Sequence, residues 1–500
     1  MAKIKLTTKV DGEVLVVGLG LKNKKLQIES GAAQIDSSSL LSTLIMMGAS
    51  GSPDEVIKLP GKNTKLIVFT GLGNLDDQIT CETLRRAAGS AARELHGNKS
   101  AIFALPHKSV VELSAIAEGA ALGSYTFVEF LGSKKSEQKS PLAQIDVLSK
   151  FSDTAQAKDA IKRAEIIADQ TAMVRDLINT PPSHLTPDSF CLRMKKEGAK
   201  YGVKVAILNE VALKKGGYGG IIGVGQGSAN PPRLLHISYS PSKFKKRFAF
   251  VGKGITFDTG GLALKPAQGM EAMKSDMSGA AAVVAAVFAI AQLKIPVALD
   301  AWAPLAENMV SDTATRPSDV ITIYGGKTVE VLNPDAEGRL VLADALIRAA
   351  EVGKKLGGLD GIVDVATLTG AQVVALGTRT SAVMSNNDKF SAEFLAAAAI
   401  AGESFWPMPL PIELRASLDS PIADLANIGD RSGGMLVAGL FLKEFIDPQT
   451  PWLHLDIAGP AFNEKKAHGY TPVGGTGIAL RSLITLAELA ASQSKTPSKS

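Results

Sequence analysis

Residues 248–261 read FAFVGKGITFDTGG, and residues 278–304 read SGAAAVVAAVFAIAQLKIPVALDAWAP. The first four, Phe248–Val251, form a short and uniformly apolar run, which predicts a buried strand. Ser278–Leu293 is apolar over the length of a helix, and Val297–Pro304 again has the pattern of a buried strand. A strand, a helix and a second strand in this order are typical of an α/β fold, with a mostly parallel sheet between helices.

The same alternation extends over most of the chain. Near the N-terminus, the strand-like Lys65–Thr70 precedes the helical spacing of Cys81–Leu95. In the middle, Asp159–Asn179 has the pattern of one long amphipathic helix and ends before two prolines, which forbid its continuation. We therefore predict an α/β protein of two αβ domains, the larger with a central mixed sheet flanked by helices. The predicted parts are a smaller N-terminal domain at 1–157, a linker helix at 158–180 and a larger C-terminal domain at 181–500.

The composition is that of an ordinary globular protein. Of 500 residues, 45% are hydrophobic and 21% are charged, and the formal net charge is +5. These values exclude global disorder and give no strong electrostatic footprint for nucleic acid. No segment approaches the roughly 20 uninterrupted apolar residues of a membrane span, so we expect no membrane association. Two cysteines, Cys81 and Cys191, cannot build a disulfide framework, and Met1–Lys9 lacks the apolar part of a secretory signal, which predicts a cytoplasmic protein.

Four carboxylates stand beside expected strand ends or helix starts. Asp258 follows a predicted strand, Asp276 precedes the apolar helix, and Asp335 and Glu337 lie in the segment NPDAEGRL at residues 333–340. Ligands of α/β proteins bind at the carboxyl ends of the strands. Carboxylates buried together repel one another unless cations neutralise them. The pattern therefore predicts a divalent-ion site, and Mg²⁺, Mn²⁺ and Zn²⁺ are all compatible with such ligands.

Basic residues accompany these carboxylates. Arg339 keeps its proton, so we expect it to hold an anion, whereas Lys253 beside two metals can become a neutral ligand. On extended backbone, Asp335 and Glu337 would project to the same face. Taken singly, Asp276 is also explained as a helix N-cap. Asp335 and Glu337 are also explained as acidic residues in a turn, where they favour the N-terminus of the helix that follows.

These segments resemble the cytosolic leucyl aminopeptidase family, whose members are two-metal exopeptidases. The family signature Asn-Thr-Asp-Ala-Glu-Gly-Arg-Leu matches residues 333–340, except that Pro334 takes the place of the threonine. The blocks GKGITFD at 252–258, MKSDM at 273–277 and HLDIAG at 454–459 also fit the family. Because Asp335 and Glu337 keep their spacing, we expect metal binding to be retained, and any effect of Pro334 to fall on the Asp335 carbonyl.

The resemblance implies a role for each matching position. Asp258 and Glu337 would bridge two ions, Lys253 would bind through its neutral amine, and Asp335 would bind in part through its backbone carbonyl. The implied metal ligands are Lys253, Asp258, Asp276, Asp335 and Glu337. Lys265 and Arg339 would be catalytic: the lysine would hydrogen-bond the substrate carbonyl and the gem-diolate formed from it, and the arginine would hold a bicarbonate ion that acts as general base. The implied substrate-binding residues are Met273, Thr367, Leu368, Gly370, Ala458 and Ala461.

The resemblance also implies an activity and its cofactors. It implies a leucyl aminopeptidase that releases N-terminal residues, preferentially leucine and other apolar ones, from peptides. Two divalent ions per subunit, Mn²⁺ or Zn²⁺, would hold the water that attacks the scissile carbonyl. Catalysis would lie in the domain at 181–500. The family further implies a cytoplasmic homohexamer, with the N-terminal domain in assembly or regulation.

The sequence leaves two alternatives to an active peptidase, a DNA-binding role and an inactive homologue. Some members of the family bind DNA through their N-terminal domains, so an additional DNA-binding or regulatory role is the alternative. The sequence pI of about 8.9 permits it, but no helix-turn-helix or basic and aromatic stripe is present, so we expect no nucleic-acid partner. An inactive structural homologue is disfavoured by the intact lysines, arginine and four carboxylates.

Overall fold

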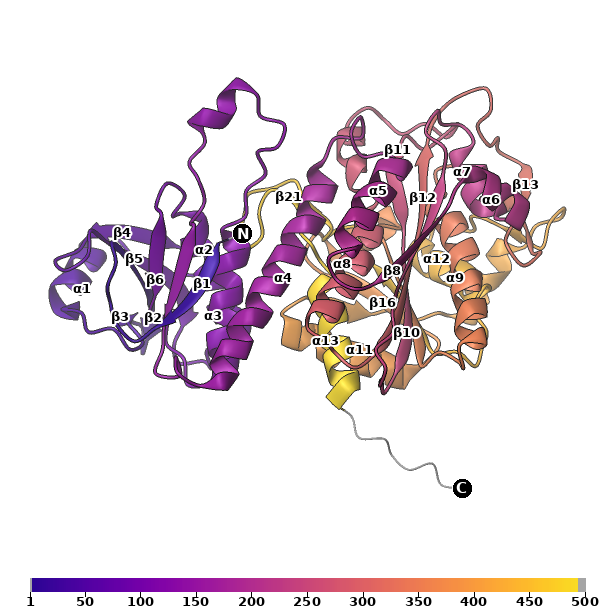
Figure 1. Cartoon of the computed structure of the whole chain (residues 1–500). Helices are drawn as coiled ribbons and strands as arrows, with labels where there is room; N and C mark the ends of the chain where they lie inside the picture. The colour runs from indigo at the N-terminus through magenta and orange to yellow at the C-terminus, as the bar shows by residue number, and fades with distance from the viewer. Residues whose placement is uncertain (1, 493–500) are drawn as a thin grey trace. The chain divides into compact units, whose positions relative to one another are not determined.

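The computed structural model describes residues 2–492 and divides into two compact units (Figure 1). The first unit comprises the chain up to Ala172 together with Asn463–Val473, and the second comprises Met173–Phe462 and the chain from Gly474 onward. Helix α4 (Ala155–Asn179) crosses the boundary between the units in sequence. The expected fold class is confirmed, with a smaller N-terminal αβ unit and a larger C-terminal one.

The first unit contains a seven-stranded sheet in the order β1-β7-β6-β2-β5-β4, with β3 paired to β2. Helices α2 and α3 bury an alanine-rich face against this sheet. Their starts are fixed locally, because the hydroxyls of Thr80 and Ser109 accept backbone N–H groups of the first helical turns. The elements are β1 (Lys3–Thr7), β2 (Val14–Lys22), β3 (Lys25–Glu29), α1 (Ser37–Met46), β4 (Val56–Pro60), β5 (Leu66–Asn74), α2 (Cys81–Arg93), β6 (Ser100–Phe103), α3 (Val110–Gly123), η1 (Ser133–Glu137) and β7 (Gln144–Leu148).

The second unit is built on a nine-stranded mixed sheet in the order β17-β16-β19-β15-β10-β12-β9-β8, with β11 paired to β12. Its strands are β8 (Lys204–Leu208), β9 (Arg233–Tyr239), β10 (Arg247–Gly252), β11 (Gly254–Asp258), β12 (Ala298–Asn308), β15 (Gly361–Ala366), β16 (Ser381–Ser385), β17 (Phe405–Pro407) and β19 (Trp452–Asp456). Smaller sheets join β13 (Asp319–Thr322), β14 (Thr328–Val331) and β18 (Leu425–Ala426), and β20 (Phe462–Asn463) with β21 (Gly474–Gly475). The helices are α5 (Pro187–Gly198), α6 (Glu210–Gly216), α7 (Gly219–Gly225), η2 (Met270–Ser275), α8 (Ser278–Gln292), α9 (Gly338–Lys355), α10 (Gly370–Leu376), α11 (Asp388–Ala401), η3 (Ile412–Leu418), α12 (Gly434–Lys443) and α13 (Leu480–Ser492).

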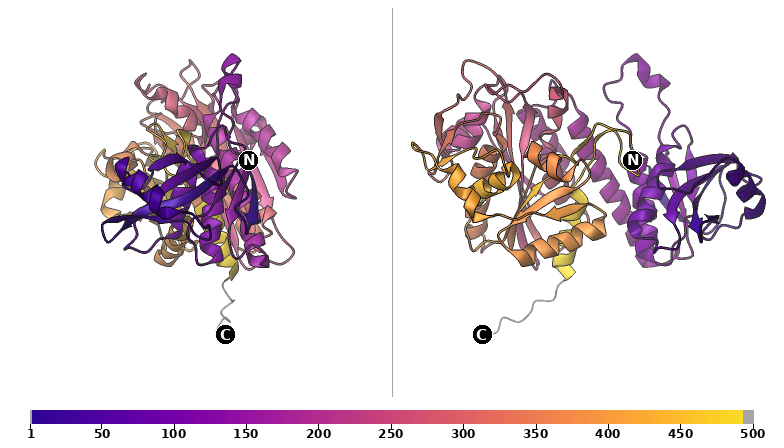
Figure 2. Two further views of the ribbon diagram at one scale, coloured as in Figure 1. Left: turned by 90° about the vertical axis from the view of Figure 1, so that its left-hand side faces the viewer. Right: turned by 180° about the vertical axis from the view of Figure 1, so that it is seen from behind.

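Helices α8 and α9 lie on opposite faces of the central strands β10 and β12 (Figure 1), and Figure 2 shows the same unit from two further sides. Every residue of α8 from Ser278 to Ala291 is buried. One described segment, Met270–Gln292, has the length and composition of a membrane span, but 94% of its apolar window is buried inside the protein. Helix α8, which makes up most of this segment, therefore lies in the core of the unit, and this explains why the helix is apolar all round.

The position of the site follows from the sheet. At the centre of the sheet, β10 pairs in parallel with both β12 and β15, and β15 pairs in parallel with β19. The carboxyl ends of these four strands therefore meet at one edge. Lys253 directly follows β10, and Asp258 is the last residue of β11. Thr367 directly follows β15, and Asp456 is the last residue of β19. The edge that the sequence analysis singled out is thus the edge at which the predicted site residues gather.

Candidate metal centre

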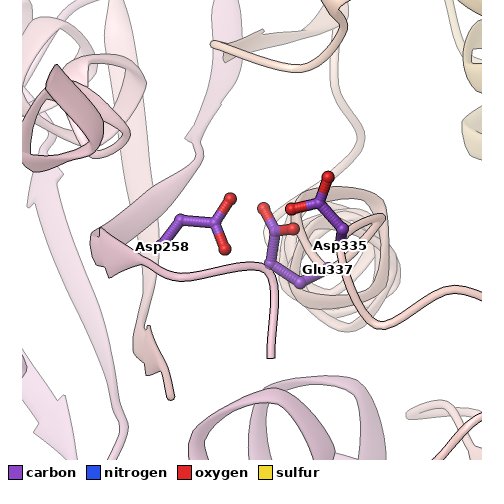
Figure 3. Close-up of side chains that lie close together, drawn as sticks. All are labelled: Asp258, Asp335 and Glu337. Atoms are coloured by element: carbon purple, nitrogen blue, oxygen red, sulfur yellow. The ribbon is translucent and has the colours of Figure 1, made fainter. Parts of the chain in front are cut away.

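Three carboxylates from two distant segments converge at this edge. One oxygen each of Asp258, Asp335 and Glu337 lies within 4.8 Å of the others. Figure 3 shows their carboxylates pointing toward one another, that of Asp258 from the end of a strand and those of Asp335 and Glu337 from beside a helix. Three carboxylate oxygens this close form a set of hard ligands of the kind that divalent cations bind.

Lys253 links the fourth carboxylate to this group. Its Nζ lies 2.9 Å from Asp276 Oδ2 and 2.8 Å from Glu337 Oε1, and it donates a hydrogen bond to the carbonyl oxygen of Thr367 at 2.8 Å. The Thr367 hydroxyl in turn donates to Asp276 Oδ1 at 2.7 Å. Lys253, Asp276 and Glu337 are each at most 5% exposed. The lysine is therefore a buried cation between two carboxylates.

Lys265 makes the corresponding contacts on the other side of the centre. Its Nζ lies 2.8 Å from Asp258 Oδ2 and also contacts Asp335 Oδ1. Asp258 is further held by the backbone N–H of Gly260 and the side-chain amide of Asn308, each 2.8 Å from its Oδ1. The structure thus brings Lys265 and all five predicted metal ligands into one network.

The charges of this network do not balance. Four carboxylates face two lysines, and burial raises the pKa of the carboxyls of Asp276, Asp335 and Glu337 above the ordinary range. Burial by itself lowers the pKa of Lys253, but the carboxylates of Asp276 and Glu337 outweigh it and raise that pKa. The protein groups alone therefore favour a charged Lys253, and the neutral amine expected from the sequence depends on the positive charge of bound ions.

One buried oxygen tests whether a metal fits these residues. Glu337 Oε2 is fully buried and has no hydrogen-bond partner among the described residues. A buried carboxylate oxygen without a partner is costly, and a cation removes that cost. The donor set, its excess of negative charge and this oxygen all fit divalent cations.

The segment that carries Asp335 and Glu337 is a turn. Its two acidic residues do not both lie on extended backbone, because Glu337 has helical backbone angles. The backbone N–H of Ala336 donates to the carbonyl oxygen of Asn333 at 3.0 Å, and the N–H of Asp335 donates to the Asn333 side chain at 2.9 Å. The asparagine before the proline closes the chain on itself, and this turn still places both carboxylates toward Asp258.

The capping explanations do not account for the acidic residues. Helix α8 has Met277 as its N-cap, without a side-chain cap, and Asp276 instead contacts Lys253 and Thr367. Glu337 stands at the N-cap of α9 but makes no side-chain cap hydrogen bond. Their side chains are therefore committed to the site and not to the helix ends.

Arg339 lies in the first turn of α9 and is buried. Its Nη1 donates to the carbonyl oxygen of Asn427 at 2.7 Å, and its guanidinium lies 5.8 Å from the centre of the Phe441 ring. Its Nε has no hydrogen-bond partner among the residues that the structure describes. Burial lowers the pKa of Arg339 to about 10, so it stays cationic at neutral pH with a donor to spare.

The residues expected to bind substrate lie on three segments of the same edge. Thr367 and Leu368 follow β15, and Gly370 begins α10, where it is exposed. Met273 lies in η2 and is partly exposed. Ala458 follows β19 and is also partly exposed, whereas Ala461 is only 1% exposed.

Sequence reasoning assigned no role to Asp456, although it lies in the quoted block HLDIAG. Its Oδ1 accepts the backbone N–H groups of Leu368 at 3.1 Å and Ala458 at 3.2 Å, and its Oδ2 accepts the Thr369 hydroxyl at 2.7 Å. One buried carboxylate thereby holds together two of the segments that are expected to bind substrate. A buried acidic residue at a strand end was the available signal.

Asn308 and Asn427 were also missed. Asn308 Nδ2 donates both to Asp258 Oδ1 and to the carbonyl oxygen of Pro334. Asn427 bonds the backbone at Leu332 and Asn333, before the turn, and at Ala336, after it. Neither residue stands in a motif that the sequence analysis used, and hydrogen bonds to distant backbone leave no pattern in a single sequence.

Comparison with known proteins accounts for this geometry. Residues 172–484 match the model of the cytosol aminopeptidase family, catalytic domain, and residues 14–134 match the model of its N-terminal domain. The chain belongs to the cytosol aminopeptidase family. It is accordingly a metal-dependent aminopeptidase, a hydrolase that acts on peptides, and the resemblance seen in the sequence is confirmed at the level of the family.

Members of the cytosol aminopeptidase family resemble the chain over nearly its whole length. A probable cytosol aminopeptidase of Streptomyces avermitilis is 50% identical over 497 residues and covers 96% of both chains. One of Rhodococcus opacus is 48% identical over 486 residues, covering 95% of this chain and 94% of the other. Among solved structures, the bottromycin maturation enzyme BotP in complex with Mn superimposes with a TM-score of 0.84 at 35% identity, covering 96% of this chain and all of that one.

Proposed function

We propose that this cytosol aminopeptidase is a leucyl aminopeptidase that removes leucine and other apolar residues from the N-termini of peptides in the cytoplasm. The proposed cofactors are two divalent ions per subunit, Mn²⁺ or Zn²⁺, and a bicarbonate ion. The observation that carries the proposal is the convergence of Asp258, Asp335 and Glu337. Lys253 lies beside them and joins Glu337 to Asp276. The complex of the related BotP with Mn supports manganese as one of the ions.

Each group of the proposed site has a chemical task. Lys253, Asp258, Asp276, Asp335 and Glu337 would hold the ions. When bound, a pair of divalent ions supplies an activated water and polarises a carbonyl group. Lys265, which is 20% exposed in its side chain, would donate a hydrogen bond to the carbonyl oxygen of the substrate and stabilise the negative charge that develops there.

Arg339 would hold the bicarbonate, whose oxygen would take the proton from the attacking water. The buried Nε without a hydrogen-bond partner among the described residues supports an anion beside the guanidinium. A planar anion such as bicarbonate suits the fork of guanidinium donors. The positive charge of the arginine would in turn keep the ion in place during turnover.

The preference for apolar side chains would come from the residues around the substrate's first side chain. The residues that would line this pocket are Met273, Thr367, Gly370, Ala458 and Ala461. Leu368 and Gly370 would contact the peptide backbone. The Thr367 hydroxyl is engaged with Asp276, which leaves its methyl group for apolar contact. A pocket of this kind selects between aliphatic side chains by the area they bury.

One assay tests reaction, metal need and specificity together. The protein is stripped with a chelator, and hydrolysis of leucyl, alanyl, lysyl and N-acetyl-leucyl anilides is followed as Mn²⁺, Zn²⁺ or Mg²⁺ is added back. We expect no turnover without metal, recovery with Mn²⁺ or Zn²⁺, fastest release from the leucyl anilide and none from the acetylated one. Equal activity in the stripped protein would overturn the proposal.

We further propose the homohexamer that the family resemblance implies, with the N-terminal unit in assembly. The relevant measurement is the mass in solution by light scattering or sedimentation. About six times the chain mass of 52.2 kDa is the expected result, and a monomer at working concentration would contradict it.

A further inference from the structure

We propose that Asn427 is the positioning residue of the metal-binding turn. It would hold the backbone around Asp335 and Glu337 in the one conformation in which both carboxylates reach the metals. This inference rests on the proposed function, because it assigns Asn427 to the same site. Asn427 is 0% exposed and follows β18, which pairs in parallel with β14 just before the turn.

The side chain of Asn427 bonds to both ends of the turn. Its Oδ1 accepts the backbone N–H groups of Leu332 at 2.8 Å and Asn333 at 3.1 Å. Its Nδ2 donates to the carbonyl oxygens of Asn333 at 2.7 Å and Ala336 at 3.4 Å. Ala336 is the residue between the two predicted metal ligands, so the amide spans the segment that sets their spacing.

The backbone of Asn427 adds two further bonds. Its N–H donates to the carbonyl oxygen of Glu330 at 2.9 Å, which continues the pairing of β14 with β18. Its carbonyl oxygen accepts from Arg339 Nη1 at 2.7 Å. Every polar atom of the residue is therefore used, and all its bonds go to the turn, to the strand that leads into it or to the first turn of the helix that follows.

The turn needs this external support. Asp335 and Ala336 each donate one backbone hydrogen bond to Asn333, and Asn308 donates one to the Pro334 carbonyl oxygen. Strand β14 ends before the turn, and the first bonds of α9 reach back only to the Glu337 carbonyl oxygen. A short loop with so few internal bonds samples several conformations, and each conformation places the two carboxylates differently. Partners that fix the groups carrying metal ligands typically change metal affinity by 10- to 100-fold.

Asn427→Ala separates positioning from other effects. It removes the four side-chain bonds and leaves the main-chain carbonyl that holds Arg339. We therefore expect metal affinity, measured by calorimetric titration of the chelator-stripped protein with Mn²⁺, to fall at least about tenfold. Peptidase activity should be lost at limiting Mn²⁺ and recover toward that of the wild type at saturating Mn²⁺, since the reacting groups are intact. Asn427→Ser, which keeps a hydroxyl in place of the amide, should lose affinity by a smaller factor.

Asn386 supplies a matched control. Its side-chain amide also bonds to backbone groups at the start of β19. It donates to the Thr450 carbonyl oxygen at 3.0 Å and accepts the Trp452 N–H at 2.8 Å. Asn386→Ala should lower the unfolding temperature yet leave Mn²⁺ affinity within about twofold of the wild type, as expected for a residue without contact to the site.

The outcomes are distinct. If the stripped wild-type protein takes up neither Mn²⁺ nor, in the same titration, Zn²⁺, the proposed function fails and this inference fails with it. If the wild type binds Mn²⁺ and the folded Asn427→Ala or Asn427→Ser variant binds it equally well, only the role of Asn427 is overturned. The same holds if Asn386→Ala weakens Mn²⁺ binding as much as the Asn427 variants do, since the effect would then be one of general stability.

Discussion

Gly338, the first residue of α9, lies directly against the side chain of Lys253. A Cβ atom built on Gly338 would stand 2.5 Å from Lys253 Cε and 2.7 Å from its Nζ, closer than real contacts allow. The same Nζ lies between Asp276 and Glu337. The missing side chain at position 338 thus makes room for the cation that joins two of the predicted metal ligands.

Gly338→Ala should therefore displace Lys253 without breaking the helix. Alanine is the best helix former, so the substitution costs nothing in helix propensity. We expect Mn²⁺ affinity and kcat/KM to fall about tenfold or more, because one ligand and its neighbours move. Calorimetric titration and the leucyl anilide assay measure the two effects.

Gly434, the first residue of α12, is the control for that substitution. A Cβ atom there would meet only Ala371 Cβ, at an ordinary 3.8 Å. Gly434→Ala should leave metal affinity and activity unchanged. If both alanine variants behave like the wild type, the close contact of Gly338 does not constrain Lys253.

The parts of the fold that a single sequence reveals are those with strong local signals. Segments β10, α8 and β12 were predicted within a few residues because their side chains are apolar and nearly all buried. The prolines after Asn179 marked the end of α4 at the residue where it ends. The four carboxylates of the site were found because each follows a strand or precedes a helix.

What was missed depends on contacts between distant residues. The sequence left extended backbone and a turn open at Asp335, and the hydrogen bonds to Asn333 that close the turn were not foreseen. Asn308, Asn427 and Asp456 each bond to at least one backbone group far away in the chain. Such bonds need no special residue in the partner, so the sequence carries no trace of the pairing.

Glu337→Gln tests the proposed bridging ligand. The amide keeps the volume of the side chain but loses its charge, so it cannot neutralise two cations. We expect fewer than two Mn²⁺ ions per chain by metal analysis, and no measurable turnover of leucyl anilide. Glu330 is a comparable buried carboxylate outside the centre, where it accepts the hydroxyls of Ser318 and Ser420. Normal metal content in Glu337→Gln, or equal losses in Glu330→Gln, would contradict the assignment.

Arg339→Ala addresses the proposed bicarbonate. The arginine contacts none of the metal-binding carboxylates by a hydrogen bond among the described residues, and its Nη1 binds the Asn427 carbonyl oxygen. We expect kcat to fall while metal content stays near that of the wild type. In buffer depleted of carbon dioxide, added bicarbonate should stimulate the wild type and have no effect on the variant. Loss of both metals in the variant would show that the arginine is needed for metal binding instead.

Asp456→Ala tests the carboxylate that joins the two substrate-side segments. Removing it leaves the N–H groups of Leu368 and Ala458 and the Thr369 hydroxyl without their acceptor. Because those segments would contact the peptide, KM for leucyl peptides should rise about tenfold or more with smaller change in kcat. Metal titration should match the wild type. A variant with unchanged KM but weakened metal binding would place the role of Asp456 at the metals.

Asp344, in the middle of α9, links stability to pH. Its side chain is 0% exposed, and its two oxygens accept the backbone N–H groups of Ile221 and Tyr324, each at 2.7 Å. Burial raises the pKa of this carboxyl to about 7, although the backbone N–H groups act in the opposite direction. In the unfolded chain, the pKa of an aspartate is about 3.9. Between these values the folded protein keeps a proton that the unfolded chain releases.

The contribution of Asp344 to stability must therefore fall as pH rises from about 4 to 7, by an amount on the order of a few kcal/mol. Asp344→Asn cannot titrate, so this decrease is absent from the variant, while all other ionisable groups are common to both proteins. We expect the variant to be less stable than the wild type at pH 5, since one amide cannot accept all the N–H groups, and the gap to narrow by pH 8. Urea midpoints at the two pH values measure the gap, and parallel pH profiles would show that Asp344 is ionised throughout the folded state.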